Sequence, residues 1–193
     1  GGIGSGKSCV VRVFRTLGIP SYDCDSAAKD LYDRDAQLLE AVVGRVGPDV
    51  LDAAGRLDRK ALSDKIFSDP SLLADIEALV HPAVIRDFGK WKSGQEVPLV
   101  VIESAILLEK PCFAPLYDCV VAVSAPEEVR ISRVVARDGC TPEQVRRRMK
   151  AQWTDAARAA QADYILENND RQPLLPAIKD IIEKEKRRWK RQI

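Results

Sequence analysis

Eight residues at the start of the sequence, GGIGSGKS from Gly1 to Ser8, have the types and spacing of a loop that binds phosphate groups. Gly1, Gly6, Lys7 and Ser8 match the pattern G-x-x-x-x-G-K-[ST]. Backbone N–H groups of such a loop surround phosphate oxygens at the positive end of the following helix. Lys7 would reach the β- and γ-phosphates of a nucleoside triphosphate, and the Ser8 hydroxyl would bind Mg²⁺. The alternative is a plain glycine-rich turn, but the four matching positions favour phosphate binding.

Two acidic residues follow the next strand-like run, in YDCDSAAKD from Tyr22 to Asp30. Residues 19–23 are predicted to form a strand whose carboxyl end faces the phosphates, because right-handed crossovers dominate parallel sheets. Asp23 and Asp25 would then point the same way if the strand continued that far. One of them would accept a proton from an attacking hydroxyl, and one would cap a helix beginning near Ser26. We assign the chemistry to Asp25, and support or metal binding to Asp23.

Along the chain around these residues, short apolar runs alternate with helical patterns. This alternation is typical of an α/β fold with a parallel sheet. Strands are predicted at 19–23, 97–103, 118–124 and 163–166. Helices are predicted at 7–17, from a capping box at 124–127 through 136, from a second capping box at 141–144 through 152, and from 173 into the terminal EKEKRRWKRQI.

The region from Ser26 to about Lys92 breaks the alternation, since it contains helical patterns and no convincing strand. We interpret it as a helical insertion with a helix start at Asp69 and a kink or interruption at Pro82. His81, the single histidine, lies in this region. For this side chain a structural role with a substrate contact is favoured over proton transfer.

Composition restricts the classes of function. The 193 residues carry 30 basic and 29 acidic side chains, a net charge of +1, so no overall field attracts nucleic acid or a membrane surface. No membrane segment or secretion signal is predicted, and the five scattered cysteines suggest reduced thiols in the cytoplasm. A phosphate loop normally follows a buried strand, so we expect further residues upstream of Gly1 in the native protein. The oligomeric state stays open.

Several segments together resemble the dephospho-CoA kinase family, in order and over essentially the whole chain. They are GGIGSGKS, YDCDSAAKDLY, LSDKIFSDPSLLADIEALVHPAV, VIESAILLE, RVVARD and RRRMKAQ. The resemblance implies a P-loop NTPase-type parallel sheet flanked by helices, with a helical substrate insertion and a small lid. It implies transfer of the ATP γ-phosphoryl group to the ribose 3′-hydroxyl of dephospho-CoA. By position, the core is 1–25, 95–136 and 155–193, the insertion 26–94 and the lid 137–154.

The same resemblance assigns roles to residues. Asp25 would be the base, and the proline-led family pattern that ends in an acid matches Glu109, leaving the role of Glu103 open. Arg133 and Arg137 lie one helical turn apart and are predicted to contact ATP or the transferring phosphoryl group, although such pairs usually form a solvated stripe. The implied ATP-binding residues are Gly1, Gly2, Ile3, Gly4, Ser5, Gly6, Lys7, Ser8 and Cys9, and the implied substrate-binding residues are Asp25, His81 and Glu109.

Two other functions remain as alternatives. A kinase for a nucleoside monophosphate or another small metabolite would share the loop and the lid, but the insertion with its VHPAV segment argues against it. A nucleotide-dependent switch or adaptor would turn ATP over slowly without a small acceptor. The N-K-x-D sequence that switch GTPases use to recognise the base is not in the sequence.

Overall fold

The computed structural model describes residues 1–191, and the chain divides into two compact units. The first comprises Gly1–Tyr22 and the chain from Gln95 onward, and the second comprises Asp23–Gly94. Residues 192–193, the last two of the predicted terminal helix, lie outside the described part. None of the helices in residues 1–191 combines the length and the hydropathy of a membrane-spanning segment.

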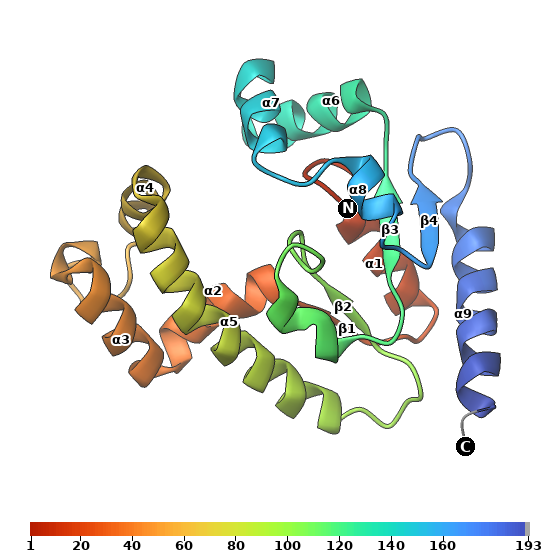
Figure 1. The fold of residues 1–193 in the computed structure, drawn as a ribbon, viewed down its shortest axis with the longest axis horizontal. Coiled ribbons are helices and arrows are strands. Elements are labelled where there is room, and N and C mark those ends of the chain that lie inside the picture. Colours follow the sequence, from red (N-terminus) through yellow and green to blue (C-terminus); the bar gives the residue numbers. More distant parts are fainter. Residues whose placement is uncertain (192–193) are drawn as a thin grey trace. The chain divides into compact units, whose positions relative to one another are not determined.

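The first unit contains the strands and the helices around them (Figure 1). Its elements are α1 (Lys7–Thr16), β1 (Ser21–Asp23, ending on the first residue of the second unit), β2 (Val101–Glu103), η2 (Pro111–Leu116), β3 (Val121–Ser124), α6 (Glu127–Asp138), α7 (Pro142–Lys150), α8 (Asp155–Ala159), β4 (Tyr164–Glu167) and α9 (Leu174–Lys190). β1 neighbours β2, and β3 pairs in parallel with β4 from Val121 opposite Tyr164 to Ser124 opposite Glu167.

One apolar core joins the two strand pairs of this unit. Helix α1 contacts both β2 and α9, and α9 packs along β4 (Figure 1). The core is made of buried side chains from α1, β3, β4, α9 and the segment between α1 and β1, which are Val10, Phe14, Ile19, Val123, Leu166, Ile178, Ile181 and Ile182. A smaller cluster of Ile131, Val134 and Val145 holds α6 to α7, with Ile3 packed against it. The loop before Lys7 is therefore in apolar contact with α6 and α7 through Ile3.

The second unit is helical. Its elements are α2 (Cys24–Arg34), α3 (Ala36–Val46), η1 (Pro48–Val50), α4 (Arg59–Ser68) and α5 (Pro70–Ser93). Helix α5 contacts each of the three other α-helices, and all four begin after an aspartate whose side chain accepts backbone N–H bonds. The predicted start at Asp69 is confirmed. Helix α5 runs unbroken through Pro82 and buries Val80, Ala83 and Val84 on both sides of it, so the predicted interruption is wrong and a kink there stays a prediction.

Two local predictions in the first unit have opposite outcomes. The capping box of α7 is confirmed, since Thr141 Oγ1 accepts from Gln144 N and Gln144 Oε1 accepts from Thr141 N. The capping box at Ser124 is wrong. Ser124 is the last residue of β3, opposite Glu167, so α6 begins only at Glu127 and no side chain caps it.

Candidate active site

The loop before α1 has the backbone shape of an anion-binding turn. Gly4 and Gly6 have φ values of 76° and 87°, which side-chain-bearing residues rarely adopt, and Ser5 N donates to Gly2 O at 3.2 Å. A Cβ on Gly6 would lie 2.0 Å from Asn168 Nδ2, and one on Gly4 would lie 2.5 Å from Arg130 O. These two positions need glycine both for their conformation and because other groups approach so closely. The first N–H groups of α1 then follow directly, and such groups have no acceptor inside their own helix.

Lys7 and Glu103 form an ion pair beside this loop. Lys7 Nζ lies 3.8 Å from Glu103 Oε1, and both side chains are largely buried. Glu103 is the last residue of β2, so a strand end places a carboxylate next to the lysine of the motif. The sequence left the role of Glu103 open, and the structure makes it the partner of Lys7. Ser8 and Cys9 are both exposed in the first turn of α1.

Arg133 lies against the loop, whereas Arg137 does not. Arg133 Nη1 is 3.4 Å from both Gly4 O and Ser5 O, and its Nη2 donates to Asp170 Oδ1 at 2.6 Å. Arg137 donates to Asp138 Oδ1 at 2.6 Å. The hydrogen bond from Arg137, together with one from Arg148, holds the pKa of the Asp138 carboxyl below its ordinary value. The structure thus brings only one of the two predicted arginines to the loop, and the part of either in phosphoryl transfer stays a prediction.

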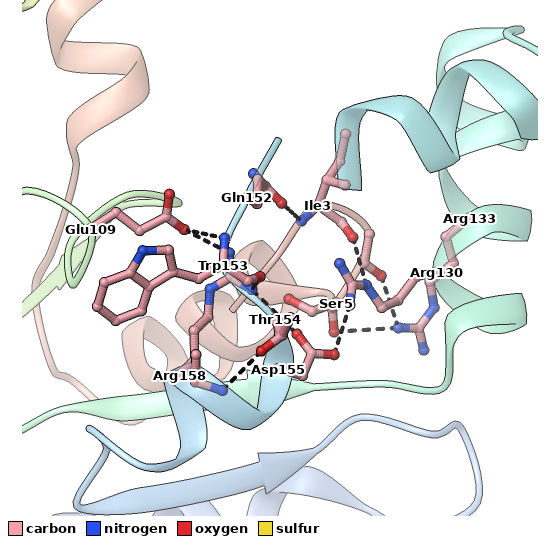
Figure 2. Close-up of polar contacts among 12 residues, drawn as sticks. Ile3, Ser5, Glu109, Arg130, Arg133, Gln152, Trp153, Thr154, Asp155 and Arg158 are labelled. Carbon is pink, nitrogen blue, oxygen red and sulfur yellow. Dashed lines mark hydrogen bonds and ion pairs between the residues drawn. The ribbon is translucent and has the colours of Figure 1, made fainter. Parts of the chain in front are cut away.

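A chain of charged side chains that includes two buried arginines runs beside the loop (Figure 2). Arg130 Nε donates to Ile3 O at 2.9 Å, and its Nη1 donates to Asp155 Oδ2 at 2.7 Å. Asp155 Oδ1 also accepts from Arg158 Nη1 at 3.3 Å, and Arg158 Nη2 donates to Glu109 Oε1 at 2.8 Å. The side chains of Arg130 and Arg158 are only 7% and 4% exposed. Glu109, predicted to bind substrate, is placed in this network by its contact with Arg158.

Gln152, like Arg130, is hydrogen-bonded to the backbone of Ile3 at the start of the loop. Its Oε1 accepts from Ile3 N at 2.9 Å, while Arg130 binds the carbonyl of the same residue. Figure 2 shows both side chains converging on Ile3. Gln152 follows α7, which ends at Lys150 and not at the predicted Gln152. Because the helix ends early, the glutamine side chain is available to the loop.

Asn168, directly after β4, contacts the loop as well. Its Nδ2 donates to Ser5 O at 3.0 Å, and its own N–H donates to Ser124 O at 2.7 Å. Arg133 Nη2 donates to Asn168 O at 3.1 Å and to Asn168 Oδ1 at 3.3 Å. Asn168 is 7% exposed. A buried asparagine thus joins the loop, the end of β3 and Arg133.

The second unit holds the remaining predicted residues. Asp23 caps α2, its Oδ1 accepting from Asp25 N at 3.0 Å and from Ser26 N at 3.1 Å. Because this cap ends the strand at Asp23, Asp25 lies in the first turn of α2 and not on an extended strand. His81 lies within α5 and is half-buried.

Four side chains of the loop's surroundings were missed from the sequence, namely Arg130, Gln152, Asp155 and Arg158. Arg130 carries a usable signal, because it lies one helical turn before the buried Val134 and so falls on the apolar face of α6. Arg158 is flanked by alanines in a short helix. An arginine placed among apolar or small residues indicates a buried cation with partners.

Comparison with known proteins identifies the family. The family model described as dephospho-CoA kinase matches residues 1–173. The chain belongs to the dephospho-CoA kinase family. A dephospho-CoA kinase of Porphyromonas gingivalis is 44% identical over 184 residues, covering 95% of this chain and 90% of its own. One of Bacteroides fragilis is 33% identical over 183 residues, covering 94% and 88%.

Solved structures agree with the fold. A Thermus thermophilus protein has a TM-score of 0.80 and 34% identity, with 95% of this chain and 91% of that one covered. A dephospho-CoA kinase from Campylobacter jejuni has a TM-score of 0.63 at 20% identity, covers 97% and 94%, and bears on the fold alone. The predicted α/β class with parallel strands flanked by helices is confirmed. The dephospho-CoA kinase family comprises ATP-using enzymes that catalyse the last step of coenzyme A biosynthesis, and the chain is such a kinase.

Proposed function

We propose that this chain transfers the γ-phosphoryl group of ATP to the ribose 3′-hydroxyl of dephospho-CoA, with the first unit holding ATP and Asp25 activating the acceptor. The observation that carries the proposal is the loop Gly1–Ser8, shaped by two left-handed glycines, with Lys7 beside Glu103, in a chain that matches the family over residues 1–173. Phosphoryl transfer needs positioning and charge stabilisation more than covalent chemistry. The loop supplies both.

Within the first unit, the proposed ATP contacts follow the direction of the loop. The N–H groups at the start of α1 face the β- and γ-phosphates, and Lys7 binds the same oxygens. The Lys7–Glu103 pair keeps the ammonium group beside the loop in a largely buried setting. Arg133, already at the loop, and Arg137, after rearrangement from Asp138, supply further positive charge. The segment 137–154 is proposed as the lid.

Magnesium fits the residues present. The Ser8 hydroxyl and the Glu103 carboxylate are hard oxygen donors, which Mg²⁺ prefers. Within residues 1–191, no cluster of three or more His, Cys, Asp or Glu side chains could hold a metal. In kinases, Mg²⁺ is usually held by one or two side chains together with substrate phosphates. When bound, Mg²⁺ neutralises charge on the phosphates, and Ser8 is the residue proposed to hold it.

The second unit is proposed to bind dephospho-CoA through the insertion 26–94, with His81 among its contacts. Glu109, in the first unit, is proposed as a further substrate contact. Asp25 would accept the proton of the 3′-hydroxyl as that oxygen attacks phosphorus. The cap made by Asp23 fixes the backbone of Asp25 at the start of α2. A cytoplasmic location stays a prediction.

An ADP-release assay tests the proposal. The purified chain is given ATP and Mg²⁺ with dephospho-CoA, with nucleoside monophosphates, or with no acceptor. We expect rapid ADP release only with dephospho-CoA, together with a product carrying a 3′-phosphate by mass spectrometry and NMR. ADP release that depends on a nucleoside monophosphate would mean that this compound, and not dephospho-CoA, is the acceptor. Slow ADP release at the same rate with every acceptor and with none would indicate a switch or adaptor.

Ser8 offers a matched pair of variants for the metal. Ser8→Thr keeps the hydroxyl that the motif allows, and Ser8→Ala removes it. The threonine variant should keep the wild-type dependence on Mg²⁺ concentration, while the alanine variant should need more Mg²⁺ for half-maximal turnover. Equal Mg²⁺ dependence in both variants would remove Ser8 from the metal site.

A further inference from the structure

The carbonyl oxygens of the phosphate loop are held by side chains from distant parts of the chain. Ile3 O accepts from Arg130 at 2.9 Å, Ser5 O accepts from Asn168 at 3.0 Å, and Gly4 O lies 3.4 Å from Arg133. Three consecutive peptide groups therefore direct their oxygens to donors that belong to α6 and to the end of β4. Ile3 O and Ser5 O have the shorter of these contacts.

The direction of a carbonyl fixes the direction of the next N–H, because the peptide group is planar and trans. When Ser5 O points to Asn168, the N–H of Gly6 in the same peptide group points the opposite way. Gly6 is the left-handed residue that directly precedes α1. Asn168 is the nearer of the two donors at Ser5 O, at 3.0 Å against 3.4 Å for Arg133, so its contact is the stronger constraint on the direction of the Gly6 N–H.

We infer that Asn168 is a positioning residue for ATP: its side-chain amide orients the Ser5–Gly6 peptide and so sets the phosphate-binding face of the loop. The inference rests on the proposed function, because ATP is taken as the ligand of the loop. Asn168 acts through the peptide and does not touch the substrate. The Asn168–Ser5 hydrogen bond should have a large effect because Asn168 is only 7% exposed, so bulk water does not replace the bond when it is lost.

The surroundings of Asn168 fix its amide in this orientation. The carbonyl end, Oδ1, accepts from Arg133 at 3.3 Å, so the NH₂ end is left to face Ser5 O. The backbone N–H of Asn168 is bound to Ser124 O, which ties the residue to the end of β3. A Cβ on Gly6 would be 2.0 Å from Nδ2, so the amide occupies the space beside Gly6 that a side chain would fill.

Asn169 is a matched control. It is the next residue and the same type, is half-buried, and its Oδ1 accepts from Arg171 N at 3.0 Å, within its own turn. Asn168→Ala removes the donor to Ser5 O and the acceptor for Arg133. Asn168→Asp keeps the size and the acceptor for Arg133 but replaces the NH₂ group by a second oxygen, which repels Ser5 O.

The experiment measures ADP binding by titration calorimetry, which needs no acceptor, and both Michaelis constants on the same preparations. We expect both Asn168 variants to weaken ADP binding about tenfold and to raise the KM for ATP by a similar factor. The KM for dephospho-CoA should stay within about twofold of wild type. Asn169→Ala should bind ADP as the wild type does.

Three results would overturn the inference: wild-type ADP affinity in Asn168→Asp, an equal rise of both Michaelis constants, or an equal loss of ADP affinity in Asn169→Ala. If Asn168→Ala does not fold, the isosteric Asn168→Asp decides alone. Failure of the proposed function would give a different result. The wild type would then bind ADP but would not form ADP from ATP when dephospho-CoA is added.

Discussion

The two units of the molecule use charged side chains in different ways. In the second unit, aspartates begin all four α-helices and ion pairs such as Arg45–Asp75 lie on the surface, with side chains 55% and 36% exposed. In the first unit, Arg130 and Arg158 are buried beside the phosphate loop and share Asp155. A surface pair contributes little to stability, whereas a buried pair is costly to break.

This difference indicates that, in the first unit, charged side chains are buried for function and not for stability. Burying a guanidinium group costs several kcal/mol and rarely gains net stability, so apolar residues would serve a plain core at least as well. The buried Arg130 instead holds Ile3, and the half-buried Arg133 lies against the carbonyls of Gly4 and Ser5. These arginines hold the loop in its conformation before a ligand binds. The helices of the second unit pack without buried arginines of this kind among the residues that the structure describes.

The largest effect is expected at the shared carboxylate. Asp155→Ala should lower the free energy of unfolding by about 3 kcal/mol, because it leaves Arg130 buried without its anion. It should also raise the KM for ATP, since Arg130 holds Ile3 O. Chemical denaturation and steady-state kinetics measure both. A loss below about 1 kcal/mol would mean that the buried network is no different from a surface pair.

A smaller effect is expected at the helix starts of the second unit. Asp69→Ala removes the acceptor for the N–H groups of Ser71 and Leu72 and should cost about 1 kcal/mol of unfolding free energy. Both Michaelis constants should stay near wild type. Asp69→Asn, which keeps the accepting oxygen, is the matched control and should recover most of the stability. A raised KM for ATP in the alanine variant would break the distinction between the units.

The smallest effect is expected at the surface pair. Asp75→Asn removes the charge that faces Arg45 and should change the unfolding free energy by less than about 1 kcal/mol. Raising the salt concentration should shrink the difference further, because exposed charges are screened. A cost as large as that of Asp155→Ala, at any salt concentration, would contradict the contrast drawn between the units.

Features set by neighbouring residues could be predicted from the sequence. The loop, the cap at Asp69 and the capping box at Thr141 depend on contiguous patterns, and the structure contains all three. The start of α6 was misplaced because the same local pattern at Ser124 competes with pairing between β3 and β4. Sheet pairing is a tertiary interaction and overrode the local signal.

Contacts between distant segments could not be predicted in this way. Gln152 binds a residue 149 positions away, and Asn168 one 163 positions away. In the sequence, Asn168 and Asn169 follow a strand-like run, and asparagine pairs at such a position are more often simple turns than sites. The roles of Gln152 and Asn168 depend on how α7 and β4 end relative to the loop. That information lies in the packing of the first unit.

We propose that the two units have different roles, with ATP held by the loop of the first unit and the acceptor activated by Asp25 of the second. Measuring ADP affinity and turnover of Asp25→Asn on one preparation tests this separation of roles. ADP affinity should stay within about twofold of wild type and kcat should fall at least about a hundredfold, as expected for loss of a general base. Turnover near that of the wild type would contradict it.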